Sequence, residues 1–381
     1  MPKLTVCFSA DVDGLRDNKL FDKNISAKFP GAMWVTHLRG QIPNSVEFLT
    51  SDVALDRVKG KSLNPRNILL IQHNFDRECN ELVARGAKLV LLTMFESPLY
   101  ASRFYDEVLE ISKGTHWLLT FEGLSRGVVN SIHAHFPSFA VNDLTSNSGH
   151  IPWSDRKFAS MVVGNKYVLT QPFRLTGGTE YCAWWIGKAV RQCFAHRGLS
   201  INYEHAAFQL QDRRLEIIEE LLRRRKLGLF GDGWDKLYRI SPDMRKRIIP
   251  LLNGVKVSPV SDKRACLSNF KFNICFENFA APGYITEKIF DAMLAKTVPV
   301  YLGAQDVAKY IPSNAYINAS VFNSMSALAD YLDTVEVQEA TAIIDAGQDF
   351  LRSNAGLKYT YESMADRVAD KLRAFLENPA R

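Results

Sequence analysis

The sequence has no hydrophobic run long enough to cross a membrane. Its longest apolar stretches, Lys88 to Phe95 and His116 to Phe121, fall far short of the roughly 20 residues that a membrane-spanning helix needs. The first residues enter a short apolar run without the charged lead and long apolar core of a signal peptide. We therefore expect no transmembrane segment, at most a peripheral membrane association, and a cytoplasmic protein unless the chain is a truncated Golgi protein.

The usual signatures of metal, disulfide and dinucleotide sites are also missing. The six cysteines form no C-x-x-C pair and the histidines no H-E-x-x-H spacing, so we expect reduced, mostly buried thiols and no metal ion. Asp11-Val-Asp13 spells a metal-binding DxD triplet, which we interpret as a chance match. His133-Ala-His135 is interpreted as a partly buried strand pair, and Gly231-Asp-Gly233 lacks the third glycine of a dinucleotide fingerprint.

The composition is that of a folded protein, with 46% hydrophobic and 23% charged residues and no internal repeat. A chain of 381 residues is too long for one comfortable core, so two domains are expected. The net charge of +6 is compatible with nucleic acid, an acidic membrane surface or a phosphorylated substrate. The densest basic cluster, Arg223–Lys226, closes a predicted helix, and we interpret it as a solvated helix end.

Short apolar strands alternate with helical stretches along the whole chain, which predicts parallel sheets covered by helices. The expected strands are Leu4–Phe8, Asn67–Gln72, Lys88–Met94, His116–Phe121, Phe158–Val163, Leu227–Phe230, Phe272–Phe276, Val298–Leu302 and Tyr316–Asn318. The expected helices are Asp76–Arg85, Ala101–Ile111, Asp212–Arg225, Ile285–Lys296 and Met325–Leu332.

A polar, turn-rich segment between about Phe139 and Trp153 interrupts both patterns and marks a domain boundary. We therefore expect an N-terminal domain over residues 1–150, a C-terminal domain over 151–355 and a terminal helix in 356–381. Two Rossmann-like, doubly wound α/β domains facing each other would leave a cleft at the carboxyl ends of their strands, where ligands of such folds bind.

The most informative segment is a strand, Phe270-Lys-Phe-Asn-Ile-Cys-Phe-Glu-Asn278, which is followed by Ala281-Pro-Gly283 and a predicted helix near Tyr284. At helical spacing, one side of this helix gathers Tyr284, Glu287, Lys288 and Asp291, and the other gathers Ile285, Ile289, Ala292 and Met293. A helix N-terminus after a glycine turn offers N–H groups and a positive dipole end, which suit a phosphate. A solvated helix face is the alternative interpretation.

Arg214 and Glu96 are two further candidates. Arg214 points along the apolar face of its predicted helix, where a cation needs an anionic partner, either a protein carboxylate or a ligand phosphate. Glu96 directly follows the apolar strand Lys88–Met94, on the ligand side of such a fold. A carboxylate there can deprotonate a sugar hydroxyl, although Glu96-Ser-Pro98 alone can equally be a helix start.

These segments resemble the α-1,3/4-fucosyltransferases of glycosyltransferase family 10. The resemblance is carried by Phe270 to Glu277-Asn278, by Tyr284-Ile-Thr-Glu-Lys288 and by Val298-Pro-Val-Tyr-Leu-Gly303. Weaker agreement extends it to Lys157-Phe-Ala-Ser160 with Asn165, Arg214, Phe230-Gly231 and Glu96-Ser-Pro98. The clear match spans about residues 150 to 315, and the N-terminal half matches only at Glu96.

The resemblance implies a GT-B fold and an inverting, metal-independent transfer of fucose from GDP-fucose to an N-acetylglucosamine-containing oligosaccharide, with no nucleic acid partner. Residues 1–150 would bind the acceptor and 151–355 the donor. Glu96 would be the general base. In the donor site, Arg214 and Lys288 would bind the phosphates, Tyr284 would support them, and Glu287 would bind the ribose or the neighbouring sugar. The donor site would also include Asn165, Glu277 and Asn278. The alternatives are a transferase of another GDP-sugar and a catalytically silent glycan-binding protein.

One segment departs from the family pattern. Roughly forty residues, including Thr176-Gly-Gly-Thr-Glu-Tyr-Cys-Ala-Trp-Trp185, separate Asn165 from Arg214. Trp184 and Trp185 can stack on a sugar ring, but adjacent tryptophans on a helix more often pack in a core.

Overall fold

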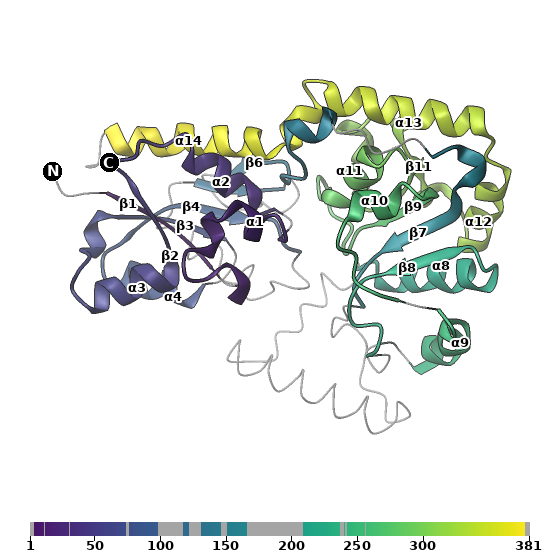
Figure 1. The fold of residues 1–381 in the computed structure, drawn as a ribbon, viewed down its shortest axis with the longest axis horizontal. Coiled ribbons are helices and arrows are strands. Elements are labelled where there is room, and N and C mark those ends of the chain that lie inside the picture. Colours follow the sequence, from purple (N-terminus) through teal and green to yellow (C-terminus); the bar gives the residue numbers. More distant parts are fainter. Residues whose placement is uncertain are drawn as a thin grey trace. The chain divides into compact units, whose positions relative to one another are not determined.

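The computed structural model divides into two compact units (Figure 1). Unit 1 comprises Met1–Leu144, Pro282–Glu287 and Asn354–Arg381, and unit 2 comprises Thr145–Ala281 and Lys288–Ser353. The described residues are 4–10, 12–29, 31–73, 76–97, 117–121, 131–145, 151–165, 209–236, 240, 242–255 and 257–377. The chain begins in unit 1, passes into unit 2, contributes Pro282–Glu287 to unit 1 and ends in unit 1.

Unit 1 is built on a six-stranded sheet with the order β2-β1-β3-β4-β5-β6. All of its strand pairs are parallel, with one irregularity in the pairing of β3 with β4 between Leu70 and Ile71. The strands are β1 (Thr5–Phe8), β2 (Glu47–Thr50), β3 (Ile68–His73), β4 (Lys88–Met94), β5 (Trp117–Thr120) and β6 (Ser131–His133). Parallel pairing brings the carboxyl ends of all six strands to one edge.

The helices described in unit 1 are α1 (Lys23–Ser26), α2 (Met33–Arg39), α3 (Ser51–Lys59), α4 (Arg77–Ala84) and α14 (Tyr361–Glu377). Helix α4 begins after Asp76, whose side chain accepts from the N–H groups of Glu78 and Cys79. The terminal helix α14 lies beside α2, and Phe375 on it meets the ring of Trp117 with 5.2 Å between ring centroids.

One histidine near the sheet edge of unit 1 gives the fold a predictable pH dependence. His135 packs against Tyr359 with ring centroids 4.4 Å apart, and burial, followed by the charges of His133, Arg367 and Lys358, lowers the pKa of His135 to about 3. In the unfolded chain the same imidazole titrates near 6.5. Its neutral form therefore contributes stability that is complete above about pH 6.5 and is lost as the pH falls toward 3.

We expect this single group to remove about 2 kcal/mol of unfolding free energy between pH 7 and pH 5. Urea denaturation at both pH values gives the loss of unfolding free energy between pH 7 and pH 5. This loss should be about 2 kcal/mol smaller in the His135→Phe variant than in the wild type. The comparison cancels any change in packing that is the same at both pH values. An unchanged difference would show that His135 is already charged in the folded state.

Unit 2 contains a five-stranded parallel sheet with the order β11-β10-β9-β7-β8. Its strands are β7 (Lys157–Val162), β8 (Leu227–Phe230), β9 (Phe270–Phe276), β10 (Val298–Leu302) and β11 (Ile317–Asn318). Around it lie α8 (Gln211–Arg223), α9 (Pro242–Leu252), α10 (Lys263–Leu267), α11 (Glu287–Leu294), α12 (Met325–Thr334) and α13 (Val337–Arg352). Buried residues of these helices and strands form a continuous core, with Ile218, Phe272 and Val300 fully inside.

Every strand expected from the sequence is present, within two residues at each end. The expected helix Ala101–Ile111 lies outside the described residues. Helix α11 corrects the expectation of a helix over Ile285–Lys296, because it begins at Glu287 and ends at Leu294. In the part of the chain that the structure describes, no helix combines the length and apolar character needed to cross a bilayer.

Candidate functional site

The carboxyl end of β9 gathers several of the predicted site residues within unit 2. Glu277 follows the strand directly, and its backbone N–H donates to the carbonyl of Leu302 at 2.7 Å. The Glu277 side chain is fully buried and forms an ion pair with Lys288 on α11, with 2.9 Å between Oε2 and Nζ. The Lys288 side chain is 15% exposed, so this cation is largely buried and has its counter-charge at the strand end.

Arg214 reaches the same strand end from α8. Its Nε donates to the carbonyl of Phe276 at 3.0 Å and its Nη2 donates to the same oxygen at 2.5 Å, and the residue is 1% exposed. A backbone hydrogen bond links the residue before α8 to the turn after β9: the Leu210 N–H donates to the Asn278 carbonyl at 3.1 Å. The sequence predicts an anionic partner for Arg214; the structure shows the neutral Phe276 carbonyl as one of its acceptors, and the anionic partner remains a prediction.

Gly303, directly after β10, leaves room for the side chain of Glu277. A methyl group on Gly303 would lie 2.7 Å from Cγ of Glu277 and 2.3 Å from the hydroxyl oxygen of Tyr301. Distances under 3.0 Å are not tolerated without movement, so a side chain at 303 would displace the carboxylate. The Tyr301 hydroxyl in turn accepts from the Ala304 N–H at 3.1 Å. Gly303 thus lets the backbone approach the buried ion pair closely.

Tyr284 does not lie on the helix face that the sequence predicts. It precedes α11, it is 2% exposed, and its ring packs against Phe121 with 4.9 Å between centroids. The Pro282-Gly283 turn, with Gly283 at φ 70°, is followed by non-helical residues up to Thr286. Tyr284 therefore lies before α11 and not on its face, which corrects the expectation for this residue, while the donor-binding roles of Tyr284, Glu287 and Lys288 remain predictions.

Asn165 lines a cavity of about 460 Å³ at the carboxyl ends of β7 and β8. Its side-chain amide donates to the carbonyls of Gly233 and Lys236, at 3.1 and 3.2 Å. The cavity is lined by Val162, Val163, Gly164, Asn165, Gly231, Asp232, Gly233, Lys236, Pro259, Val260 and Lys263. Since the sheet is parallel, this cavity lies at the same edge as Glu277 and Lys288. Asn165 therefore shapes the cavity by holding the loop after β8.

The sequence indicated this loop only weakly, through the Gly231-Asp-Gly233 pair after a strand. Gly231 has φ 125°, and a methyl group there would lie 2.3 Å from the carbonyl oxygen of Val163. That carbonyl also accepts from Nε1 of Trp234 at 2.8 Å. Only glycine combines this backbone conformation with so close an approach. Gly231 is therefore needed for the loop after β8 to pack closely against the end of β7. This role is different from that of a glycine in a dinucleotide fingerprint.

We expect Gly231→Ala to destabilise unit 2 by about 3 kcal/mol or more, because backbone strain and a clash with a main-chain atom add together. Gly254→Ala is the matched control, since Gly254 has φ 81° but open space around the added methyl group, and strain alone should cost about 1 kcal/mol. Urea denaturation of both variants measures the difference. Equal losses would mean that the loop moves freely away from β7.

Glu96 lies where the sequence places it, directly after β4 at the carboxyl edge of the sheet in unit 1. Its Oε1 accepts from the N–H of Ser97 at 2.9 Å, and the side chain is partly exposed. Pro98, the last residue of the predicted motif, lies outside the described residues. The position is suited to a general base, and the role remains a prediction.

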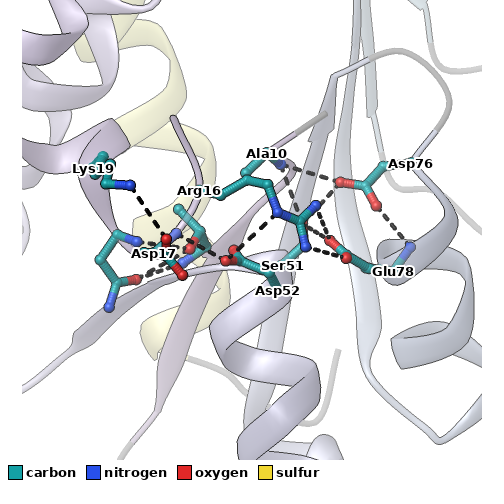
Figure 2. Close-up of polar contacts among 10 residues, drawn as sticks. Ala10, Arg16, Asp17, Lys19, Ser51, Asp52, Asp76 and Glu78 are labelled. Carbon is teal, nitrogen blue, oxygen red and sulfur yellow. Dashed lines mark hydrogen bonds and ion pairs between the residues drawn. The ribbon is translucent and has the colours of Figure 1, made fainter. Parts of the chain in front are cut away.

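A polar network that the sequence did not indicate ties together the ends of β1, β2 and β3 (Figure 2). Asp76 accepts from the Ala10 N–H at 3.1 Å and from the Ser51 hydroxyl at 2.9 Å. The Arg16 guanidinium binds both carboxylate oxygens of Glu78, at 2.6 and 3.2 Å. Because Asp76 and Glu78 have hydrogen-bond donors and a cation, we assign this network to holding the strand ends together.

The sequence predicts no metal ion and reduced, mostly buried thiols, and the structure describes some of the residues concerned. Among the described residues, no group of three histidine, cysteine or acidic side chains is placed to hold a metal ion. Cys7, Cys79, Cys266 and Cys275 are free thiols, and burial raises the pKa of each. Asp11, Cys182, Cys193 and the segment with Trp184 and Trp185 lie outside the described residues.

Solved structures identify the class of fold. The chain is similar to the crystal structure of HepE from Anabaena in complex with UDP and glucose, with a TM-score of 0.56 and 12% identity, over 97% of this chain and 100% of that one. The two parallel-sheet α/β units are those of a GT-B glycosyltransferase fold, as expected from the sequence.

Residues 202–342 match the model of "Glycosyltransferase family 10 (fucosyltransferase) C-term". Over these residues, the match bears out the resemblance inferred from the sequence. The chain is 31% identical over 120 residues to the Helicobacter pylori alpha-(1,3)-fucosyltransferase FucT, covering 31% of this chain and 25% of that protein. It is 41% identical over 66 residues to the Arabidopsis thaliana alpha-(1,4)-fucosyltransferase, covering 17% and 16%. The chain thus matches about a quarter or less of these relatives' length.

Proposed function

We propose that this protein is an inverting fucosyltransferase that moves L-fucose from GDP-fucose to a hydroxyl group of an N-acetylglucosamine-containing glycan, in α-1,3 or α-1,4 linkage, without a metal ion. The observation that carries the proposal is the cluster of Lys288, Glu277 and Arg214 at the carboxyl end of β9. The family model covers these three residues, and the relatives named as alpha-(1,3)- and alpha-(1,4)-fucosyltransferases support the choice of fucose.

The charge balance of the cluster suits a leaving diphosphate. Two cations and one carboxylate leave a single net positive charge at the strand end, next to the start of α11. Glu277 is fully buried, so it holds the Lys288 ammonium in place without being itself available to solvent. A cation fixed before the reaction stabilises developing negative charge without reorganisation, which is how such sites accelerate group transfer.

The reaction requires electrostatic stabilisation at the diphosphate that leaves the sugar. As the bond between the sugar carbon and the diphosphate oxygen breaks, positive charge develops on the sugar and negative charge on GDP. Lys288 would take the developing charge, and Arg214 would add positive potential while it holds the β9 end. Protein cations in this role remove the need for a divalent ion, which is why we propose metal-independent transfer.

The donor's nucleoside has a suitable cavity in the same unit. The cavity beside Asn165 and Gly231 is open at the sheet edge that carries Glu277, and about 460 Å³ lies within the range of small-molecule sites. Asp232, Lys236 and Lys263 bring charged groups to it. We propose that part of GDP binds there, while Glu96 in unit 1 accepts the proton of the acceptor hydroxyl.

The test is the release of GDP from GDP-fucose across a panel of oligosaccharide acceptors, with and without EDTA. We expect release that depends on an N-acetylglucosamine-containing acceptor and is insensitive to EDTA. Faster turnover of another GDP-sugar would refute the choice of fucose. Binding of glycans without any GDP release from any donor would refute transfer and indicate a glycan-binding protein. Loss of activity with EDTA would refute the metal-independent mechanism.

A further inference from the structure

A cavity in unit 2 lies at the amino ends of β7 and β10, at the opposite end of the sheet from the candidate donor site. It has a volume of about 820 Å³ and is lined by Ile151, Pro152, Trp153, Arg156, Lys296, Val337, Thr341, Ile344, Asp345, Gln348, Asp349 and Arg352. Arg156 directly precedes β7, whose carboxyl end leads to Asn165. A six-residue strand spans roughly 17 Å, so the two cavities are separate. Helix α13 provides one wall, with lining residues from Val337 to Arg352.

Arg156 is held in this cavity as a cation without an acidic partner. Its Nε donates to the carbonyl of Ile151 at 3.0 Å and its Nη1 to that of Lys296 at 2.5 Å. Among the residues the structure describes, no carboxylate forms an ion pair with it. Burial lowers the pKa of Arg156. The guanidinium therefore bears a desolvation cost that neither carbonyl offsets with a full negative charge.

The two carbonyls also fix the direction of the remaining donors. With Nε and Nη1 engaged, Nη2 has no hydrogen-bond partner among the described residues, and it is not one of the buried unpartnered atoms. It is therefore accessible from the cavity. Lys296, whose own carbonyl orients Arg156, adds a second positive charge to the same lining. This arrangement is a preorganised site for one carboxylate or phosphate group.

The facing wall carries two carboxylates as well as Arg352, whose guanidinium donates to Gln348 on the same helix. Asp345 and Asp349 lie one turn apart on α13, both are exposed, and neither forms an ion pair within the described part of the chain. Two free carboxylates repel a bare polyanion but accept hydrogen bonds from hydroxyl groups. Trp153 and Ile344 add apolar surface between the charged groups. The cavity thus offers a place for an anion, acceptors for hydroxyls and an apolar contact.

We propose that this cavity is a second saccharide site, and that it binds an acidic sugar whose carboxylate lies on Arg156 and Lys296. The hydroxyl groups would donate to Asp345 and Asp349, and a ring face would contact Trp153 and Ile344. The proposal is independent of the donor sugar and of the transfer reaction, because none of these residues belongs to the candidate donor site. Its volume accommodates a disaccharide.

Calorimetry on the full chain, saturated with GDP, tests the proposal with a glucuronic-acid-terminated disaccharide as the probe. We expect binding that is the same with and without GDP and about tenfold weaker for the methyl ester, which lacks the negative charge. Equal binding of acid and ester, displacement by GDP, or no binding would overturn the proposal. Inorganic phosphate that binds as tightly as the disaccharide would reduce the cavity to a simple anion site and overturn the saccharide assignment.

Two substitutions place the binding in the cavity. Lys296→Asn removes the charge and keeps a residue type that tolerates the φ of 53° at this position, and it should weaken binding of the acid about tenfold. Lys61→Asn is the matched control, because Lys61 is an exposed lysine with φ 57° in unit 1, and it should change nothing. Asp349→Asn should weaken the ester more than the acid, because both lose a charged hydrogen-bond acceptor but only the acid is relieved of a repulsion. Unchanged binding in Lys296→Asn would refute the site even if GDP release from GDP-fucose is demonstrated.

Discussion

Replacing Lys288 by methionine should destabilise unit 2 by about 3–5 kcal/mol, because the fully buried carboxylate of Glu277 loses its ammonium partner. The same substitution should weaken GDP binding about 10- to 100-fold, the value of one charge-assisted hydrogen bond to a phosphate. Urea denaturation measures the first effect and calorimetric titration with GDP the second. Lys19→Met is the control for loss of an exposed ion pair, since the side chains of Lys19 and Asp17 are 47% and 73% exposed. Its free energy of unfolding should stay within about 0.5 kcal/mol of the wild-type value.

The double variant Glu277→Gln with Lys288→Met separates folding from donor binding. Removing both charges eliminates the buried carboxylate that has lost its ammonium partner, so most of the lost stability should return. GDP affinity should not return, because the cation for the diphosphate is still missing. If both the stability and the GDP affinity of the double variant match the wild type, Lys288 makes no contact with the donor and the proposed site is wrong.

The sheets could be predicted from the sequence because their strands are buried on both faces. Strands such as Lys88–Met94 and Val298–Leu302 are continuous apolar runs, and their observed bounds equal the expected ones. The missed strands, β2 and β6, are short and lie at the two edges of the sheet in unit 1. Edge strands are exposed on one side, and Glu47–Thr50 and Ser131–His133 carry polar residues that conceal the pattern.

The candidate site could be predicted where local chemistry dictates position. Arg214 lies buried on the apolar face of its helix, as its spacing indicated, and Glu277 directly follows the strand that the sequence predicted. The helical wheel failed for Tyr284, because the turn at Pro282-Gly283 delays the helix to Glu287. The pairing of Lys288 with Glu277 and the cavity around Gly231 depend on contacts between distant segments, which spacing along one segment does not encode.

The replacement of Glu96 by glutamine should have the largest effect on catalysis. A general base contributes typically 10²- to 10⁴-fold to such a reaction, so we expect the rate of GDP release from GDP-fucose with acceptor to fall by about that factor. Because Glu96 belongs to unit 1, whereas Lys288, Glu277 and Arg214 belong to unit 2, GDP affinity should remain within about twofold of wild type. The fall should therefore appear in kcat and not in donor binding.

The controls distinguish a base from a structural carboxylate. Glu96→Gln keeps an oxygen that can accept from the Ser97 N–H, so the local fold should be preserved and only the proton acceptor lost. Glu96→Asp should retain part of the rate, because a shorter carboxylate still accepts a proton from less favourable geometry. Glu47→Gln, in the ion pair with Arg57 on the same unit, should be fully active. Full activity in Glu96→Gln would exclude this residue as the base and move the search to another carboxylate.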